Sequence, residues 1–231
     1  MRRVLLLVAT LLGVALTARL GWWQLDRAAE KQAQQALLLA EAERPALDNA
    51  TLATQASPQR RVRLRGHWLN ERSIWLDNRP MDGRAGFYVL TPLQLAGSAS
   101  AILVQRGWVP RDALDRSRLP PLPPAPAEVV VEGRLAASPS RVYELGQGQG
   151  GAIRQNLDPA AYAIEAGLPL LPWTVVQQGD AGDGLLRHWP AADAGLQKHY
   201  GYAFQWFALC ALILGLYVWF QLVRPWRRQR S

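Results

Sequence analysis

Histidine and cysteine side chains are scarce in this chain, and their scarcity limits the chemistry it can carry out. Among its 231 residues, the imidazoles are His67, His188 and His199, and the single thiol is Cys210. Zinc and copper centres need several such ligands, and the sequence contains no HExxH, GxSxG or phosphate-binding glycine motif. We therefore predict no disulfide, no catalytic metal centre and no enzyme activity.

His199 is the residue for which we expect a direct chemical role. It stands at the start of a long apolar segment, and Tyr202 and Trp206 follow it at spacings of three and seven, on one face of a helix. A neutral imidazole above aromatic rings at a membrane boundary is suited to axial ligation of haem iron. The alternative is a histidine that hydrogen-bonds to lipid headgroups within an interfacial belt of Tyr and Trp. The residue types alone leave both interpretations open.

Two arginine-rich segments offer sites for acidic groups. In residues 61–67 every second side chain is basic, which gives a strand one basic face. That face either binds an acidic partner or is the solvated side of a sheet. In the turn-rich residues 77–87, Arg79 and Arg84 either bind a carboxylate of a ligand or hold the loop through Asp–Arg pairs.

The segment RGWVPR, residues 106–111, is predicted to be structural before it is functional. Arg106 and Trp108 share the same parity along an expected strand. We expect Trp108 to fill the core of a domain. We expect Arg106 to make a charge-assisted bond to a carboxylate, with Asp77 as the candidate.

Two apolar segments are long enough to cross a bilayer as helices. Residues 4–24 would span about 31 Å, and Arg19 near one end can extend to the headgroups. Residues 200–223 contain no charged side chain. We interpret the first segment as a retained anchor, and a cleaved signal peptide is the alternative.

The charge distribution gives these segments an orientation. The net charge is +8, and six arginines lie outside the apolar segments, at residues 2–3 and 224–230. Between these two groups the chain holds 20 basic and 18 acidic residues, so the middle is almost neutral. Arginines that flank apolar segments indicate cytoplasmic ends rather than a nucleic-acid-binding surface. We expect a multi-pass protein of the bacterial inner membrane with a periplasmic central domain, a basic cytoplasmic tail at residues 224–231 and no nucleic-acid partner.

Between the apolar segments the pattern changes from helical to β. Residues 25–44 should extend the first helix as far as Pro45. Residues 45–198 should form a small, mainly antiparallel β (α+β) domain, as a sheet or a barrel. Asp158 and Pro159 should begin a short helix that ends at Gly167. The expected strands cover residues 61–68, 73–76, 87–91, 101–109, 129–135 and 173–178.

Seven blocks of the sequence together resemble the Surfeit locus protein 1 family. They occur in the family's order, within the same plan of two spans around one domain. Glu30 and Gln205 depart from residues that many members carry, and neither is the proposed ligand. The blocks are GWWQLDRAAEK (21–31), GHWLNERSIWLDNRPMDGRAGFYVLTPL (66–93), VQRGWVPRD (104–112), VEGRL (131–135), RQNLD (154–158), WP (189–190) and KHYGYAFQWFAL (198–209).

The resemblance implies an assembly factor for haem-copper cytochrome c oxidases that helps haem a enter the largest oxidase subunit. His199 matches a histidine regarded as a haem ligand in bacterial members, and Tyr202 and Trp206 would cover the macrocycle. The implied partners are that oxidase subunit and a haem a synthase, with haem a bound transiently. The alternative is a scaffolding protein that stabilises an oxidase assembly intermediate without binding haem. The family's structural or docking motifs correspond to Trp23, Gln24, Asp77, Asn78, Arg79, Gly83, Arg84, Arg106, Gly107 and Trp108.

Overall fold

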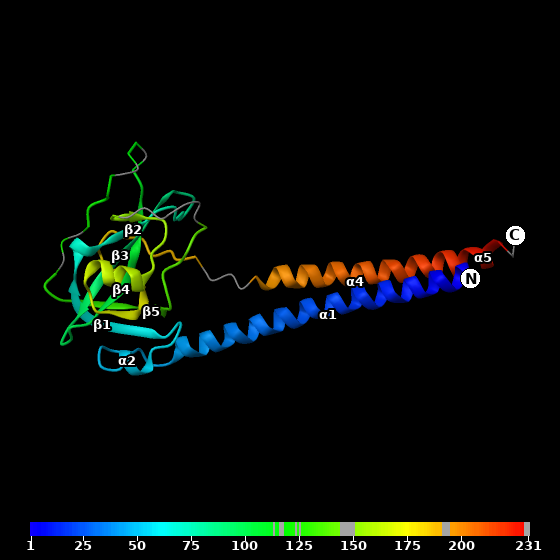
Figure 1. Ribbon diagram of the computed structural model, residues 1–231, viewed down its shortest axis with the longest axis horizontal. Helices are drawn as coiled ribbons and strands as arrows, with labels where there is room; N and C mark the ends of the chain where they lie inside the picture. The colour runs from blue at the N-terminus through cyan, green and yellow to red at the C-terminus, as the bar shows by residue number, and fades with distance from the viewer. Residues whose placement is uncertain are drawn as a thin grey trace. The chain divides into compact units, whose positions relative to one another are not determined.

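The computed structural model of the chain describes residues 1–112, 114–115, 118–122, 124, 126–143, 151–190 and 195–228. It divides into two compact units, which can be followed in Figure 1. One unit consists of Met1–Leu37 and Ala191–Ser231, and its described elements are helical. The other unit is Leu38–Pro190 and holds all the described strands. The last residues of the expected basic tail, 229–231, lie outside the described residues.

The helical unit is built from two long helices. Helix α1 (Arg2–Glu43) joins the first apolar segment and its expected extension into one continuous helix. Helix α4 (Leu196–Val218) continues through the π-helical turn η2 (Trp219–Val223) into α5 (Arg224–Arg228). Among the described residues, Arg3–Glu43 and Leu196–Trp226 are the helices long and apolar enough to cross a membrane.

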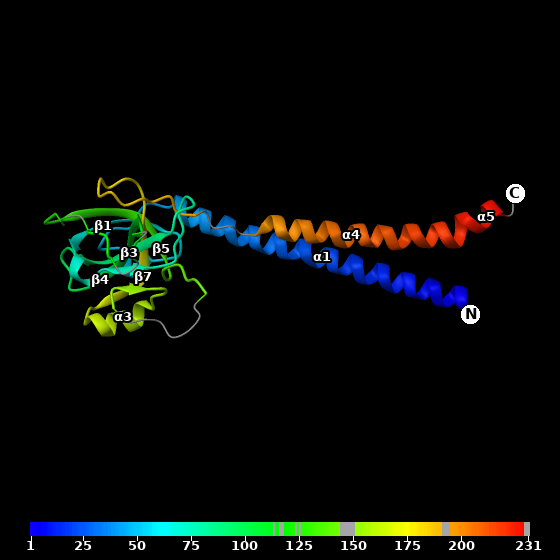
Figure 2. The same cartoon turned by 90° about the horizontal axis from the view of Figure 1, so that it is seen from above.

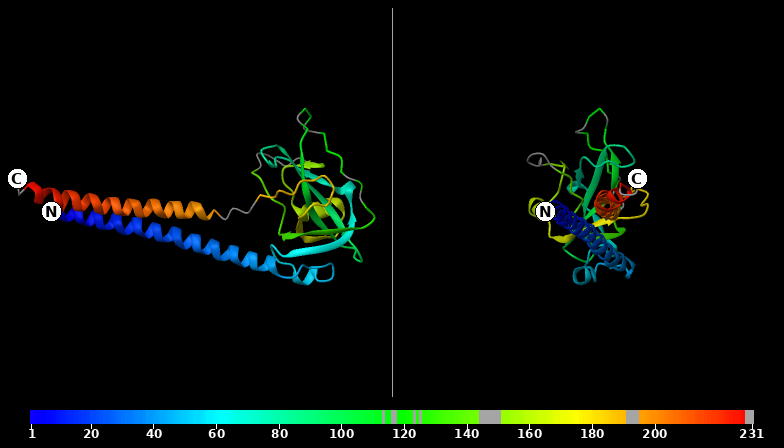
Figure 3. Two further views of the ribbon diagram at one scale, coloured as in Figure 1. Left: turned by 180° about the vertical axis from the view of Figure 1, so that it is seen from behind. Right: turned by 90° about the vertical axis from the view of Figure 1, so that its right-hand side faces the viewer.

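Helices α1 and α4 are antiparallel and approach each other closely at glycines. A Cβ atom added at Gly13 would lie 3.5 Å from the Ile213 side chain, and one at Gly21 would lie 2.8 Å from the Phe207 ring. Residue numbers therefore fall along α1 as they rise along α4. The start of α1 and the end of α4 consequently lie at the same end of the pair, as Figure 3 shows.

Five strands of the second unit close into a small barrel (Figure 2). They are hydrogen-bonded in the order β1, β5, β7, β4 and β3, and β3 pairs again with β1. The short strands β2 (Ile74–Leu76) and β6 (Ile153–Arg154) extend the sheet beyond β3. The barrel strands are β1 (Arg61–Trp68), β3 (Gly86–Leu95), β4 (Ala101–Pro110), β5 (Val129–Ala136) and β7 (Leu170–Gln177).

The sheet is mainly antiparallel, as expected, but it contains two parallel pairs, β4 with β7 and β2 with β6. Strand β3 also runs on to Leu95, past the expected end at Thr91, and passes through Pro92. Pro92 has no N–H group, and its carbonyl accepts a hydrogen bond from the Leu69 N–H at 3.0 Å. Proline therefore does not end this strand, although the sequence suggests a stop.

Helix α3 (Pro159–Ala166) begins and ends as the sequence predicts. The Asp158 carboxylate accepts hydrogen bonds from the N–H groups of Ala160 and Ala161, at 2.9 and 3.4 Å. Gly167 closes the helix in the left-handed conformation, with φ of 63°. The short helix α2 (Leu52–Gln55) and the 3-10 turn η1 (Asn70–Arg72) are additions that the sequence did not predict.

Strand β1 shows how the barrel separates its faces. Its side chains alternate, with Val62 and Leu64 in the core and the basic side chains of residues 61–67 exposed. On the outer face, Arg63 pairs with Glu132 of β5 at 3.1 Å. The predicted basic face is therefore present, and it is open to solvent.

Candidate functional site

His199 lies in the first turn of α4, on the side that faces α1. Its Nδ1 atom is 2.8 Å from Oε1 of Gln24, and both residues are partly buried. Among the described residues, the hydrogen-bond partner found for this imidazole is Gln24. An amide oxygen can only accept, so a neutral imidazole paired with it would donate from Nδ1 and keep its lone pair on Nε2.

A close approach of the helices accompanies the pair. Gly21 lies one turn before Gln24 and is buried against the Phe207 ring. Trp22 meets the same ring edge to face, with 5.9 Å between the ring centroids. Ala28, one turn after Gln24, is also buried. Gln24 and His199 therefore lie in a packed seam between the helices.

The two aromatic residues expected to accompany His199 are less enclosed. Tyr202 is 52% exposed, and Trp206 is partly buried. The buried residue after His199 is Ala203, and Phe207 makes the contact with α1. The residues of α4 that pack on α1 are therefore spaced by four, from His199 through Ala203 to Phe207. The sequence interpretation had used the spacings of three and seven, which lead to Tyr202 and Trp206. Coverage of a ligand by Tyr202 and Trp206 stays a prediction.

Basic side chains lie near this pair on α1. Lys31 follows Gln24 by seven residues on the same helix face, and its Nζ is 3.6 Å from where a Cβ of Gly195 would stand, at the start of α4. Lys31 has no ion-pair partner within the part of the chain that the structure describes. Arg27 lies over the Trp23 ring, 5.8 Å from its centroid. Arg27 also pairs with Glu30 at 2.8 Å, so Lys31 is the cation of this part of α1 that stands near the start of α4.

In the barrel unit, Trp108 and Arg79 hold the loop that follows β2. Trp108 is 1% exposed, which confirms its expected place in the core, and its Nε1 donates to the Arg79 carbonyl at 2.6 Å. Arg79 is itself 3% exposed and donates to the carbonyls of Asp77, Ser140 and Gln155. Burial lowers the pKa of this guanidinium. The idea that Arg79 binds a carboxylate is therefore wrong, because backbone oxygens surround it.

The remainder of this loop is set by its backbone and by one ion pair. Asn78 and Gly83 adopt positive φ angles of 59° and 74°. Asp77 pairs with Arg111 at 3.3 Å, which ties the loop to the end of β4. Arg84 is exposed and lies over the buried indole at 5.9 Å from its centroid. Of the two interpretations given for residues 77–87, the structure shows the one in which an Asp–Arg pair, Asp77 with Arg111, holds the loop.

Arg106 pairs with Asp183, so the expectation that it pairs with Asp77 is wrong. Its Nη2 is 3.6 Å from the Asp183 carboxylate, and its Nη1 donates to Asn70 at 3.0 Å. Arg187 binds the same carboxylate at 2.6 Å. Asp183 is remote in sequence, so local pattern could not link it to β4.

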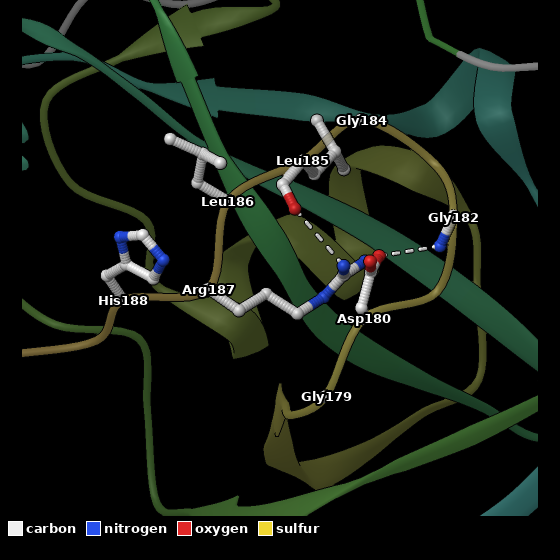
Figure 4. A pocket seen from close by; sticks show the side chains of 8 residues that line it. All are labelled: Gly179, Asp180, Gly182, Gly184, Leu185, Leu186, Arg187 and His188. Atoms are coloured by element: carbon white, nitrogen blue, oxygen red, sulfur yellow. Dashed lines mark hydrogen bonds between the residues drawn. The ribbon is translucent and has the colours of Figure 1, made fainter.

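A pocket of about 570 Å³ opens against the loop that carries Asp183 (Figure 4). Gly107 of β4 lets this loop approach, because a Cβ atom there would lie 2.5 Å from the Cβ of Leu185. Within this loop, Arg187 donates to the Leu185 carbonyl at 3.1 Å. Within the described residues, no three His, Cys, Asp or Glu side chains converge as a metal site. The pocket is lined by Gly179, Asp180, Gly182, Gly184, Leu185, Leu186, Arg187 and His188.

The family model of the SURF1 family matches residues 11–211 of this chain. The chain belongs to the SURF1 family. The resemblance seen in the seven sequence blocks is thereby confirmed. The matched region contains both members of the interhelical pair, Gln24 and His199, and the whole barrel unit.

Three relatives of this SURF1-family chain share local similarity with it. A "SURF1-like protein" of Rickettsia bellii (strain RML369-C) is 35% identical over 91 residues, which cover 38% of this chain and 37% of the relative. A "SURF1-like protein" of Rickettsia felis (strain ATCC VR-1525 / URRWXCal2) is 34% identical over 91 residues, which cover 38% and 39%. The "Surfeit locus protein 1" of Arabidopsis thaliana is 36% identical over 118 residues, which cover 45% and 33%. The similarity thus spans less than half the length of each relative.

The donor atoms beside the seam of this SURF1-family chain fit a haem. A porphyrin supplies four nitrogens to its iron, so the protein needs to provide only one or two axial ligands. One imidazole that donates from Nδ1 to Gln24 would meet that requirement through Nε2. Lys31 places a cation near the same end of α4, where a haem propionate would be attracted.

Proposed function

We propose that this chain is a membrane-anchored assembly factor for a haem-copper cytochrome c oxidase, and that it holds haem a for delivery to the largest oxidase subunit. Membership of the SURF1 family supports the role in oxidase assembly. The observation that carries the haem-binding part is the hydrogen bond between His199 and Gln24, because an imidazole that donates from Nδ1 would keep its lone pair on Nε2.

The proposal places α1 and α4 in the bilayer of a bacterial inner membrane. Helix α4 is about 34 Å long, close to the thickness of a hydrocarbon core. Large apolar side chains are exposed along both helices, as a lipid-facing surface requires, among them Leu12, Leu16, Phe204 and Leu212. The arginines at residues 2–3 and 224–230 would lie in the cytoplasm, and the barrel would lie in the periplasm.

Each residue of the site then has a task. A bound haem would supply a redox-active iron that a protein nitrogen could ligate. His199 would bind that iron through Nε2, and Lys31 would attract a propionate at the membrane surface. Tyr202 and Trp206 would lie against the macrocycle and exclude water from one side. Their partial exposure leaves a lateral path along which an oxidase subunit could receive the haem, and a haem a synthase would supply it.

An absorption spectrum tests the proposal most directly. The full chain, purified in detergent from a host that makes haem a, should carry a haem spectrum. The variant His199→Ala should lose or shift that spectrum while its abundance in the membrane stays normal. His188→Ala is the matched control, because His188 is exposed and pairs with Asp82 in the barrel unit. Equal haem content in the wild type and in His199→Ala would refute the ligand assignment.

A scaffolding role is the second candidate, and the exposed basic face of β1 favours it. Arg61, Arg63 and Arg65 present their side chains outside the barrel, where an acidic surface of an assembly intermediate could bind. Under this alternative, the purified protein carries no haem but still co-purifies with an oxidase subunit. Co-purification should then weaken when these arginines are changed to Gln and when the salt concentration rises.

The orientation of the chain can be tested with two reporter fusions. A reporter that is active only in the cytoplasm should be active when fused after Ser231. The same reporter should be silent when inserted at Gly97, in the turn between β3 and β4. The opposite pattern would put the barrel on the cytoplasmic side and would refute the proposed topology.

A further inference from the structure

The seam between α1 and α4 contains a polar pair beside small, buried residues. Gln24 and His199 are both partly buried and are joined by a 2.8 Å hydrogen bond. Thr17, Gly21 and Ala28, which share this face of α1, are all buried. A polar side chain removed from water is destabilising unless it is hydrogen-bonded. The hydrogen bond between Gln24 and His199 therefore satisfies two polar groups that are partly removed from water.

The chemistry of imidazole gives this hydrogen bond a second consequence. In a neutral imidazole, one ring nitrogen carries the proton and the other carries the lone pair. The partner of the first nitrogen decides which is which, and ligating histidines are commonly held this way by an oxygen acceptor. The Gln24 carbonyl oxygen is such an acceptor, and it lies at Nδ1.

We propose that Gln24 is a positioning residue that fixes His199 in the tautomer protonated at Nδ1 and so presents Nε2 to a haem iron. The inference rests on the proposed function for its ligand, but the tautomer is a property of the protein without haem. Gln24 acts through His199 and does not touch the iron.

Gly21 provides a second route to the same hydrogen bond. A Cβ atom at this position would lie 2.8 Å from the Phe207 ring, closer than carbon atoms can approach. The variant Gly21→Ala must therefore move Phe207 or separate the helices one turn from Gln24. Either movement should weaken the hydrogen bond to His199 without altering either partner.

The rival explanation is that the pair only holds the two helices together, as polar side chains do between membrane helices. Two substitutions separate the explanations. Gln24→Met keeps the length of the side chain and removes the acceptor. Gln24→Glu keeps an acceptor at the same place and makes it a stronger one. A tether would respond through helix packing and abundance, whereas a positioning residue responds through the state of the imidazole.

The first experiment uses the full chain in detergent, without haem and with ¹⁵N-labelled histidine. Nitrogen chemical shifts distinguish a protonated from an unprotonated ring nitrogen, and His199→Ala assigns the signals. The wild type and Gln24→Glu should show His199 protonated at Nδ1, and Gln24→Met and Gly21→Ala should lose this preference. Gln205→Met is the matched control, because Gln205 is exposed on α4. A His199 protonated at Nε2 in the wild type, or unchanged by Gln24→Met, would overturn the proposal.

The second experiment loads the same proteins with haem. Gln24→Glu should lower the reduction potential of the bound iron relative to the wild type, because a stronger acceptor makes the imidazole a more basic ligand. Gln24→Met should weaken binding or change the low-spin spectrum. If the wild type binds no haem, the proposed function fails, and the tautomer measurement still decides the role of Gln24. If haem binds and its potential and spectrum are the same in all three proteins, the positioning role fails alone.

Discussion

Replacing Trp108 by Ala should remove a large part of the stability of the barrel unit. Trp108 is 1% exposed and belongs to a cluster that includes Tyr88 and Leu103. Truncating a buried Trp to Ala costs about 3–5 kcal/mol of unfolding free energy. The Arg79 carbonyl also loses its indole donor, which adds about 1 kcal/mol. A domain of ordinary stability has only about 5–15 kcal/mol in total.

Pulse proteolysis of the detergent-solubilised full chain across a urea series measures this loss. The midpoint for Trp108→Ala should fall far below that of the wild type. Trp108→Phe should fall less, because Phe keeps most of the ring volume and loses the hydrogen bond. Ile164→Ala is the control, because Ile164 is 85% exposed on α3 and its truncation should change stability by at most about 0.5 kcal/mol. A Trp108→Ala midpoint equal to that of the control would show that Trp108 does not hold the core and would favour a docking role.

Three further outcomes are expected from the barrel unit. Gly86→Ala should lower the unfolding free energy by about 1–3 kcal/mol, and with it the urea midpoint, because its Cβ would lie 2.4 Å from both the Trp108 ring and the Val109 carbonyl; an unchanged midpoint would contradict this. Asp158→Ala should cost about 1 kcal/mol through the lost helix cap, and Asp158→Asn should cost little in the same assay. Hydrogen bonds from Arg154 lower the pKa of Glu165, so the stabilisation from ionised Glu165 is present above about pH 4.3 and is lost as the pH falls through its lowered pKa. The difference in unfolding free energy between the wild type and Glu165→Gln should therefore disappear in acid, and a difference that is independent of pH would refute the assignment.

Local signals were sufficient for several elements of the fold. The ends of α3 could be predicted because Asp158 and Gly167 each act within one turn of the helix. Strand β1 could be predicted because basic and mainly apolar residues alternate along its sequence, and the burial of its side chains follows the same alternation. Pairings between distant segments left no such signal. The parallel contact of β4 with β7, which joins two parts of the barrel sheet, depends on side-chain packing that no short window of sequence contains.

The same distinction applies to the functional residues. His199 could be singled out because few histidines are present and because it stands at the edge of an apolar segment. Its partner could not be found in this way, because Gln24 is 175 residues away and lies on another helix. For Arg106, the need for a carboxylate partner was predicted correctly, but the predicted partner, Asp77, was wrong. The actual partner is Asp183, which no local pattern links to β4.

The close approach of the helices and the polar pair depend on each other. A glutamine and a histidine in an apolar helix interface are unfavourable unless their polar atoms meet, and they can meet only where the helices are close. Gly21 allows that approach one turn from Gln24, because a larger residue would collide with Phe207. The hydrogen bond in turn opposes rotation of either helix in the seam, since rotation would leave both polar groups without a partner. The direction in which His199 presents Nε2 is therefore set by helix packing as well as by its own side-chain conformation. A haem ligand in this position would be oriented before the haem arrives, which reduces the entropy lost on binding.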